Sequence, residues 1–290
     1  HGIATRRVPT QLSIPIKADG CLQCVIGTAP VNMAEDPYDT VNKPFSFYNK
    51  SAAIAALGYS TDFENYTLCQ SMYASFDVFG VAPVIMINVL DPEERVKEQL
   101  SKEYGVVGGK IQINETGILL DKLSISSPGE AETVYKEEED YIATFNSNGT
   151  VTVAIISTGA AKNETSLKAT FAQLDPSAVT YEDVIGSYNV KTKQRTGMEL
   201  IDRVYPRLGL VPSLLLAPGW SHKPAVALAL VAKAQSIFSL FTAKVVVDLD
   251  TAEGKADSME EIREYKDHNA YSDRNMIVAW PMVAVGDYKY

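Results

Sequence analysis

Apolar residues along this chain fall into runs that predict strands and helices in alternation. Four runs are almost continuously apolar, which is typical of strands covered on both faces of a sheet, and they lie at residues 22–27, 81–90, 212–217 and 243–249. Helices are expected between them, at residues 49–57 and 63–79 and in the Ala-rich segment 223–240. A strand, a crossover helix and a following parallel strand form a right-handed unit, so the pattern predicts an α/β domain built from βαβ units.

Capping signals delimit two of the expected helices. In residues 63–79, apolar side chains recur at three- and four-residue spacing, Asp62 is an expected N-cap and Gly80 an expected C-cap. A charged helix is expected at residues 258–268, where Ser258 and Glu261 have the spacing of a capping box.

The segment between residues 93 and 185 has a different texture. Short β-type runs alternate with turn signals such as Gly108-Gly109 and Asn148-Gly149. The runs lie at residues 110–113, 117–120, 123–125, 141–145 and 151–156. We therefore expect a mixed α/β (α+β) fold in which an α/β core domain, residues 1–92 plus 186–290, is interrupted by a small antiparallel β-domain, residues 93–185, of barrel or sandwich type. The two ends of such an insertion should lie close together.

Both ends of the chain carry expectations of their own. Residues 1–20 are predicted to form an extended arm that includes an edge strand. The apolar segment 277–285 is followed almost at once by the last residue, Tyr290. This abrupt end predicts that a further C-terminal portion is missing.

Composition narrows the function classes. Apolar residues make up 46% of the chain, charged residues 21%, and the net charge is −10. An acidic chain argues against duplex binding, which needs clustered Lys and Arg, and the densest basic run, residues 191–195, is predicted to be a solvated loop. No apolar run reaches about 18 residues, so no membrane partner is predicted.

The cysteines resemble a metal or redox motif only in spacing. Cys21 and Cys24 form a C-x-x-C in a predicted strand, where residues three apart point to opposite faces. Cys69 completes an odd number. We expect buried or half-buried thiols, in keeping with a reducing cytosol.

One set of residues resembles a hydrolase site. Ser221 follows a predicted strand and precedes a helix, and with Asp248 and His268 it gives the chain order of an α/β-hydrolase triad. The nucleophile pattern G-x-S-x-G is incomplete, however, because Lys223 stands at the second glycine. Helix capping by Ser221 is the competing interpretation, and a Ser221 hydrolase is kept as the alternative function.

Three other features favour structural interpretations. Asp248, Asp250 and Glu253 offer hard oxygen ligands without the spacing of a calcium loop, so turn-forming acids are expected. Residues 105–110 do not meet the phosphate-loop pattern. The acidic run 137–140 predicts a solvated turn or a contact with a basic patch on another copy.

A binding function is a further hypothesis. A β-insertion that binds a glycan or the host depends on Tyr104, Tyr135 and Tyr141 being exposed.

The chain thus offers no catalytic, cofactor-binding or metal-binding residues that we would assign, which favours a structural or assembly protein. Three regions, in order, carry a resemblance to a known family. The first is Val25-Ile-Gly-Thr-Ala-Pro, followed by a loop with Pro44. The second is a pair of predicted helices over 52–58 and 64–79, which lead into the predicted strand 82–89. The third is Ser213-Leu-Leu-Leu-Ala-Pro-Gly-Trp-Ser, followed by a helix over 226–234, a strand over 243–250 and Ile277-Val-Ala-Trp-Pro. In this order the chain resembles contractile tail sheath proteins of tailed phages, prophages and phage-derived particles.

The resemblance implies a structural, non-enzymatic subunit without a cofactor. Sheath subunits self-assemble into a helical polymer of stacked rings around an inner tail tube, above a baseplate, and contract to drive the tube through the target envelope. Extended terminal arms add strands to a neighbour's sheet. The implied location is the virion tail, assembled in the bacterial host cytoplasm. Family members usually continue past the position of Tyr290, so a chain without that portion is expected to be monomeric.

Overall fold

The structure is a computed structural model and describes residues 22–129, 132–285 and 288–289. Its centre is a six-stranded sheet with the order β12-β11-β10-β1-β3-β2. The five strands from β12 to β3 are parallel, and β2 pairs antiparallel with β3 at one edge. The strands are β1 (Gln23–Gly27), β2 (Pro44–Phe47), β3 (Val84–Asn88), β10 (Leu214–Leu216), β11 (Lys244–Asp248) and β12 (Met276–Ala279). The predicted mixed α/β fold is confirmed.

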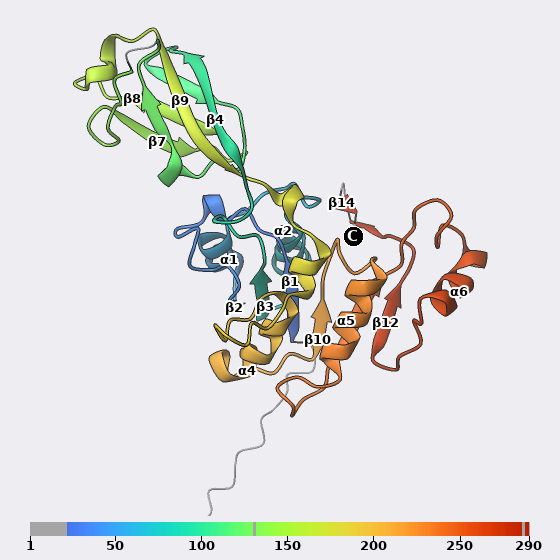
Figure 1. Ribbon diagram of the computed structural model, residues 1–290. Helices are drawn as coiled ribbons and strands as arrows, with labels where there is room; N and C mark the ends of the chain where they lie inside the picture. The colour runs from blue at the N-terminus through green and yellow to red at the C-terminus, as the bar shows by residue number, and fades with distance from the viewer. Residues whose placement is uncertain (1–21, 130–131, 286–287, 290) are drawn as a thin grey trace, which may run out of the picture.

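Helices flank this sheet (Figure 1). Helix α2 lies against β1, α4 against β2, and α5 against β10 and β11. The helices are α1 (Lys50–Leu57), α2 (Thr67–Met72) with a π-helical continuation (Tyr73–Val78), α3 (Tyr181–Ile185), α4 (Ile201–Leu208), α5 (Pro224–Ala234) and α6 (Met259–His268). Short 3-10 turns lie at Val31–Met33, Leu120–Lys122, Ala160–Asn163, Pro176–Ala178 and Gly197–Leu200.

Two expected helices are shorter than the sequence pattern predicted. The α-helix within 63–79 begins at Thr67, because Asp62 caps a preceding turn by accepting from the Asn65 N–H (3.2 Å). Its predicted end is found, since Gly80 has a φ of +61°. Helix α5 ends at Ala234 rather than at residue 240, because Phe238 and Ser239 adopt positive φ and the chain folds back to pair Ala243 N–H with Ala234 O.

Residues 96–174 form two antiparallel three-stranded sheets, β4-β9-β6 and β5-β8-β7. These sheets pack around a hydrophobic cluster of their own, which includes Ile113, Val153 and Phe171. The strands are β4 (Val96–Gly105), β5 (Lys110–Ile113), β6 (Ser124–Ser126), β7 (Tyr141–Phe145), β8 (Val151–Ile155) and β9 (Ser166–Leu174). The strand expected at 117–120 is wrong: Leu119 leaves the β-structure and is buried in the core of the six-stranded sheet.

The chain enters and leaves this β-region at one place. Val96 pairs with Leu174, and Asp175 N–H donates to Arg95 O (2.8 Å). The Arg95 guanidinium also contacts the Asp183 carboxylate at the start of α3 (2.6 Å). Figure 1 shows the β-region standing away from the six-stranded sheet on this narrow connection. The adjacency expected of an insertion is present, while the boundaries at 92/93 and 185/186 stay a prediction.

The two ends of the chain complete the fold. Helix α6 has Ser258 as N-cap, and the Ser258 hydroxyl donates to Glu261 (3.0 Å). The expected apolar strand at 277–285 is divided into β12 and a second short strand, β13 (Ala284–Val285), which pairs with β14 (Tyr288–Lys289). The predicted N-terminal arm, residues 1–20, lies outside the described residues.

Candidate functional site

The carboxyl edge of the six-stranded sheet is where an α/β protein of this topology would place a ligand. From the centre, β1 leads to β3 in one direction and β10 leads to β11 in the other. The loops that follow β1 and β10 therefore diverge between two neighbouring strands, which creates the crevice used by many α/β proteins.

Side chains fill the crevice between β1 and β10. Thr28 and Thr67 bond reciprocally, each hydroxyl accepting from the other residue's backbone N–H (3.2 Å for both). A Cβ atom on Gly27 would lie 2.2 Å from the Thr67 hydroxyl oxygen, and one on Gly219 would lie 2.7 Å from the Thr67 methyl. The Thr67 side chain thus occupies the space beside both glycines.

A buried amide closes the neighbouring end of β3. Asn88 accepts from Ala29 N–H (3.0 Å) and Leu90 N–H (3.1 Å) with its side-chain oxygen, and donates to Leu90 O (3.0 Å). Its side chain is 1% exposed. Since its polar atoms are occupied by backbone groups, Asn88 holds two loops together and offers nothing to a ligand.

Ser221, the hydrolase candidate, is bound to its own acid. The Ser221 hydroxyl donates to an Asp248 carboxylate oxygen (2.7 Å) and accepts from the Asp248 N–H (3.1 Å). The side chain is 1% exposed. In a catalytic triad a histidine stands between serine and acid and takes the serine proton. Here the two contact each other directly and join the β10 loop to the end of β11.

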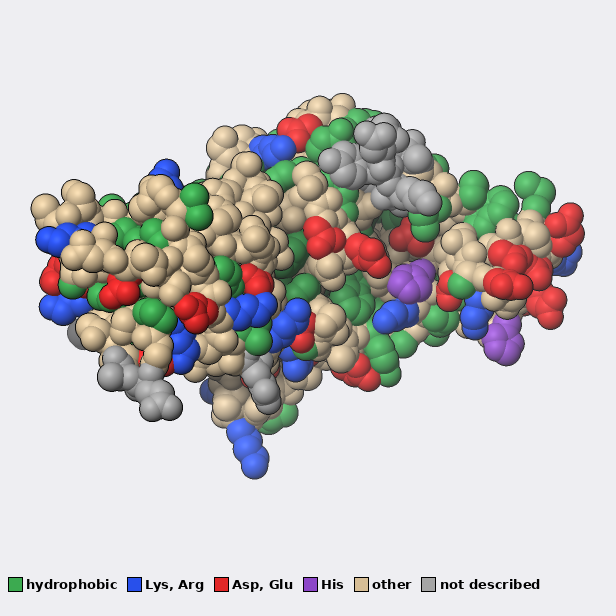
Figure 2. All heavy atoms as spheres, turned by 90° about the horizontal axis from the view of Figure 1, so that it is seen from above, with side chains coloured by type: hydrophobic (Ala, Val, Ile, Leu, Met, Phe, Trp, Pro, Cys, Tyr) green, Lys and Arg blue, Asp and Glu red, His purple; other side chains and the backbone are tan. Residues whose placement is uncertain are grey.

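The histidine of the predicted triad does not join this pair. Within the described residues, His268 forms no hydrogen bond with Ser221 or Asp248, and it ends α6. Figure 2 shows the two described histidines as separate groups. The histidine next to Ser221 in sequence is His222. Burial lowers the pKa of His222, and the nearby Asp250 opposes this effect. The structure thus brings together two members of the predicted set and leaves out the base.

The acids after β11 serve the backbone. Asp250 accepts from Ala252 N–H (3.1 Å), which forms the predicted turn, and Glu253 is exposed. Within the described ranges, no group of three or more His, Cys, Asp or Glu side chains is arranged to hold a metal ion.

The described cysteines are deeply buried. Burial raises the pKa of Cys24 and of Cys69 to about 12. Both are therefore protonated near neutral pH and poor nucleophiles. Cys21, the other half of the C-x-x-C, lies outside the described residues.

The prediction that three tyrosines of the β-insertion are exposed is wrong. Tyr135 and Tyr141 are buried, and the Tyr135 hydroxyl donates to Glu164 (2.7 Å). Tyr104 is partly buried and donates to Glu115 (2.8 Å). Alternation along the strands turned these rings inward, so the aromatic surface on which a glycan would stack is not formed by them.

The acidic run 137–140 is largely a solvated turn. Asp140 accepts from the N–H groups of Lys136 (2.9 Å) and Ala160 (2.6 Å), and these bonds lower its pKa. Glu137, Glu138 and Glu139 are exposed.

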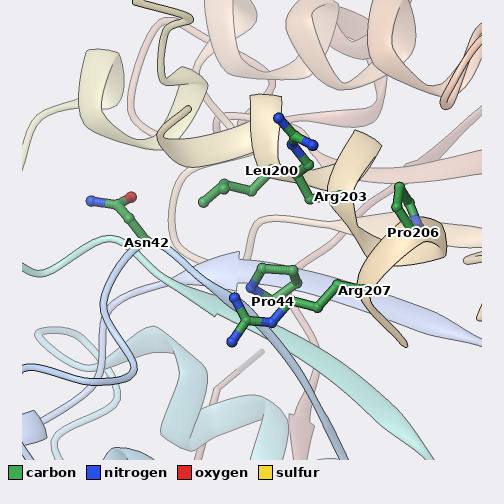
Figure 3. A pocket seen from close by; sticks show the side chains of 6 residues that line it. All are labelled: Asn42, Pro44, Leu200, Arg203, Pro206 and Arg207. Atoms are coloured by element: carbon green, nitrogen blue, oxygen red, sulfur yellow. The ribbon is translucent and has the colours of Figure 1, made fainter. Parts of the chain in front are cut away.

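A shallow hollow of about 350 Å³ lies between α4 and the chain leading into β2 (Figure 3). Six residues line it: Asn42, Pro44, Leu200, Arg203, Pro206 and Arg207. The two arginines are exposed at its rim. This hollow was not predicted from the sequence, although two arginines four positions apart, Arg203 and Arg207, could have signalled a basic side of a helix.

No family model matches the chain. It is similar to a tail sheath protein of Burkholderia phage BcepMu, with 28% identity over 238 residues, which cover 81% of this chain and 46% of that protein. The chain therefore spans about half the length of this curated relative. Within the described part of the chain, no helix is long and apolar enough to cross a membrane.

Proposed function

We propose that this chain is a structural subunit of a contractile phage tail sheath. The observation that carries the proposal is the similarity to the BcepMu tail sheath protein along 81% of the chain. The geometry agrees with a non-enzymatic role, because the carboxyl edge of the sheet is filled by Thr28, Thr67 and Asn88 and the one candidate nucleophile is tied to Asp248.

The finer parts of the proposal concern assembly. Subunits polymerise in stacked rings around an inner tail tube, above a baseplate, and the sheath contracts by rigid-body sliding of intact α/β cores. Terminal arms link the subunits by adding strands to a neighbour's sheet. The assembled protein belongs to the virion tail and forms in the cytoplasm of the bacterial host.

The domain division belongs to the same proposal. The core domain, residues 1–92 plus 186–290, supplies the contacts between subunits. The inserted β-domain, residues 93–185, decorates the exterior of the sheath, in keeping with its separate core and its single entry and exit point.

Electron microscopy of the full-length protein, expressed alone, tests the proposal. We expect rings or tubes with a regular repeat. A full-length protein that stays monodisperse and monomeric under all conditions contradicts the assembly role. A chain that reacts at Ser221 with a fluorophosphonate probe supports the hydrolase alternative instead.

A further inference from the structure

Helix α4 presents two arginines that form no ion pair among the described residues, although Arg207 adds to the effect by which Lys43 lowers the pKa of Asp39. Arg203 and Arg207 are exposed, and their four-residue spacing places them on the same side of the helix. Neither forms an ion pair with any residue in the described ranges, and Arg207 contacts the Phe45 ring (5.3 Å). Figure 3 shows both at the hollow beside Pro44.

Neighbouring cations show what a satisfied basic residue looks like in this protein. Arg195 contacts Glu199 (2.9 Å), and Lys233 contacts Glu199 (2.9 Å) and Asp202 (3.1 Å). These four side chains neutralise one another. The arginines on the outer side of α4 have no such ion pairs in the described part of the chain, and of the two Arg207 has an acid nearby, Asp39, which itself pairs with Lys43 (2.8 Å).

Helix α6 carries mainly acidic side chains on its exposed side, although the exposed Arg263 stands three residues after Glu260 and four before Asp267. Glu260, Glu264 and Asp267 follow the spacing i, i+4, i+7, so they form a ridge along one side of the helix. All three are exposed, and none pairs with a cation among the described residues. In Figure 2, acidic side chains gather at the end of the molecule that α6 occupies.

The two charged helices lie at opposite edges of the sheet and cannot meet within one chain. Helix α4 packs against β2, one outer strand, and α6 connects β11 to β12, the other outer strand. Five strand spacings separate these edges, roughly 24 Å at about 4.8 Å each. Complementary patches at opposite ends of one subunit give a head-to-tail contact, which produces rings or filaments rather than closed dimers.

We propose that α4 of one copy docks against α6 of the next, with Arg203 and Arg207 facing Glu260 and Glu264. The spacing matches, because residues four apart are about 6 Å apart along each helix. Asp267 extends the acidic ridge beyond this pair of contacts. The inference rests on the proposed function in one respect, that the partner is a second copy of this chain.

Charge reversal with complementation tests this contact. One variant carries Arg203→Glu and Arg207→Glu, and the other carries Glu260→Arg and Glu264→Arg. Sedimentation velocity at about 0.05 M and about 0.5 M salt measures self-association, since salt screens exposed ion pairs. A control with Lys110→Glu and Lys162→Glu, at exposed positions of the β-region, makes the same change in net charge as the variant with the two arginines replaced.

The contact between α4 and α6 does not depend on terminal arms. We therefore expect the unmodified protein and the control to associate at low salt and to dissociate at high salt, where the family resemblance alone implies a monomer. Each reversed variant alone should associate at least about tenfold more weakly than the unmodified protein, because like charges then face each other. An equimolar mixture of the two variants should regain association, since every contact in it again joins opposite charges. Circular dichroism checks that all variants are folded.

Several outcomes overturn the inference: an unmodified protein that is monomeric at both salt concentrations, reversed variants that associate as well as the unmodified protein, or a mixture that regains nothing. A mixture without recovery also points to another acidic partner for α4. Rings or tubes formed by the reversed variants contradict this contact alone. Charge-dependent association that never yields rings or tubes supports the contact and contradicts the sheath proposal.

Discussion

Ser221 makes two hydrogen bonds to Asp248, and they decide what this serine can do. Its hydroxyl donates a hydrogen bond to the Asp248 carboxylate, and the hydroxyl oxygen accepts one from the Asp248 N–H. Removing one partner of a buried hydrogen bond costs the desolvation of the other, about 1–3 kcal/mol. The same residue types that suggested chemistry therefore contribute to stability.

We expect Ser221→Ala to lower the free energy of unfolding by about 1–3 kcal/mol, because Asp248 loses a donor and its N–H loses an acceptor. Urea denaturation measures the change. Ser236→Ala, at an exposed position, is the matched control and should stay within about 0.5 kcal/mol. Equal effects of the two substitutions would contradict the structural role of Ser221.

The buried thiols provide a test that depends on pH. The pKa of Cys24 is raised from 9.0 to about 12 because burial disfavours the thiolate, and the pKa of Cys69 is raised in the same way. The native state therefore holds protons that the unfolded state releases above pH 9. This contribution to stability is complete below pH 9 and is lost as the pH rises toward about 12.

Accordingly, a disulfide reagent at about pH 8 should leave Cys24 and Cys69 unmodified in the folded protein and modify both in urea. Peptide mass spectrometry distinguishes these sites from Cys21. Rapid modification of either residue in the folded protein would show that its burial is wrong.

At the scale of elements, two glycines allow the chain to cross itself beside α3. A Cβ on Gly186 would lie 1.9 Å from Thr196 O, and one on Gly197 would lie 2.5 Å from Asp183 O. Both have positive φ, as does Gly209 after α4, where a Cβ would meet nothing within 4 Å. A substitution at Gly186 or Gly197 therefore meets both backbone strain and a steric conflict, whereas one at Gly209 meets backbone strain alone.

Gly186→Ala should lower the free energy of unfolding by about 3 kcal/mol or more, because backbone must move as well as adopt a strained φ. Gly209→Ala should cost only about 1 kcal/mol, since strain acts there alone. Thermal or urea unfolding of both variants measures the difference. Similar losses would mean that the segments do not cross as closely as described.

Strand cores were predictable from sequence, and element ends were less so: Ser258 caps α6 as predicted, whereas Asp62 caps a turn before α2. The apolar runs around β1, β3, β10 and β11 were identified because burial on both faces leaves a strong local signal. The end of α5 was missed because the positive φ of Phe238 and Ser239 is set by tertiary contacts, including the Tyr205 ring (5.8 Å from that of Phe238). The inward direction of Tyr135 likewise depends on contacts outside its local sequence, because its N–H donates to Ile125 O (2.8 Å) and its hydroxyl donates to Glu164 (2.7 Å).

The candidate site was partly predictable for a similar reason. Ser221 and Asp248 follow neighbouring strands, so sequence order places them at one edge of the sheet. Whether a histidine joins them depends on how α6 packs, which no local pattern reveals. The charged sides of α4 and α6 are visible as i, i+4 spacings, but their positions at opposite edges follow only from the strand order.

At the scale of the whole molecule, the β-region contacts the core in two places. At its connecting strands, Val96 pairs with Leu174, and Arg95 contacts Asp183 of α3. Around residues 118–122, Asn32 donates to Ile118 O (3.3 Å) and the Tyr38 hydroxyl donates to Asp121 (2.6 Å). Leu119 is the side chain that the region contributes to the core from outside its two connecting strands. The two parts should therefore be separable.

Replacing residues 97–173 by Asn-Gly should leave a folded core, because Val96 and Leu174 already pair as a hairpin that a two-residue turn can close. The shortened protein loses the burial of Leu119, which costs about 1.5–3 kcal/mol, and should still unfold in one cooperative urea transition. Leu119→Ala in the complete chain is the control, since it removes the same packing without changing the topology. If the shortened protein lacks a cooperative transition while that control keeps one, the β-region is part of the core's folding unit and cannot be an inserted domain.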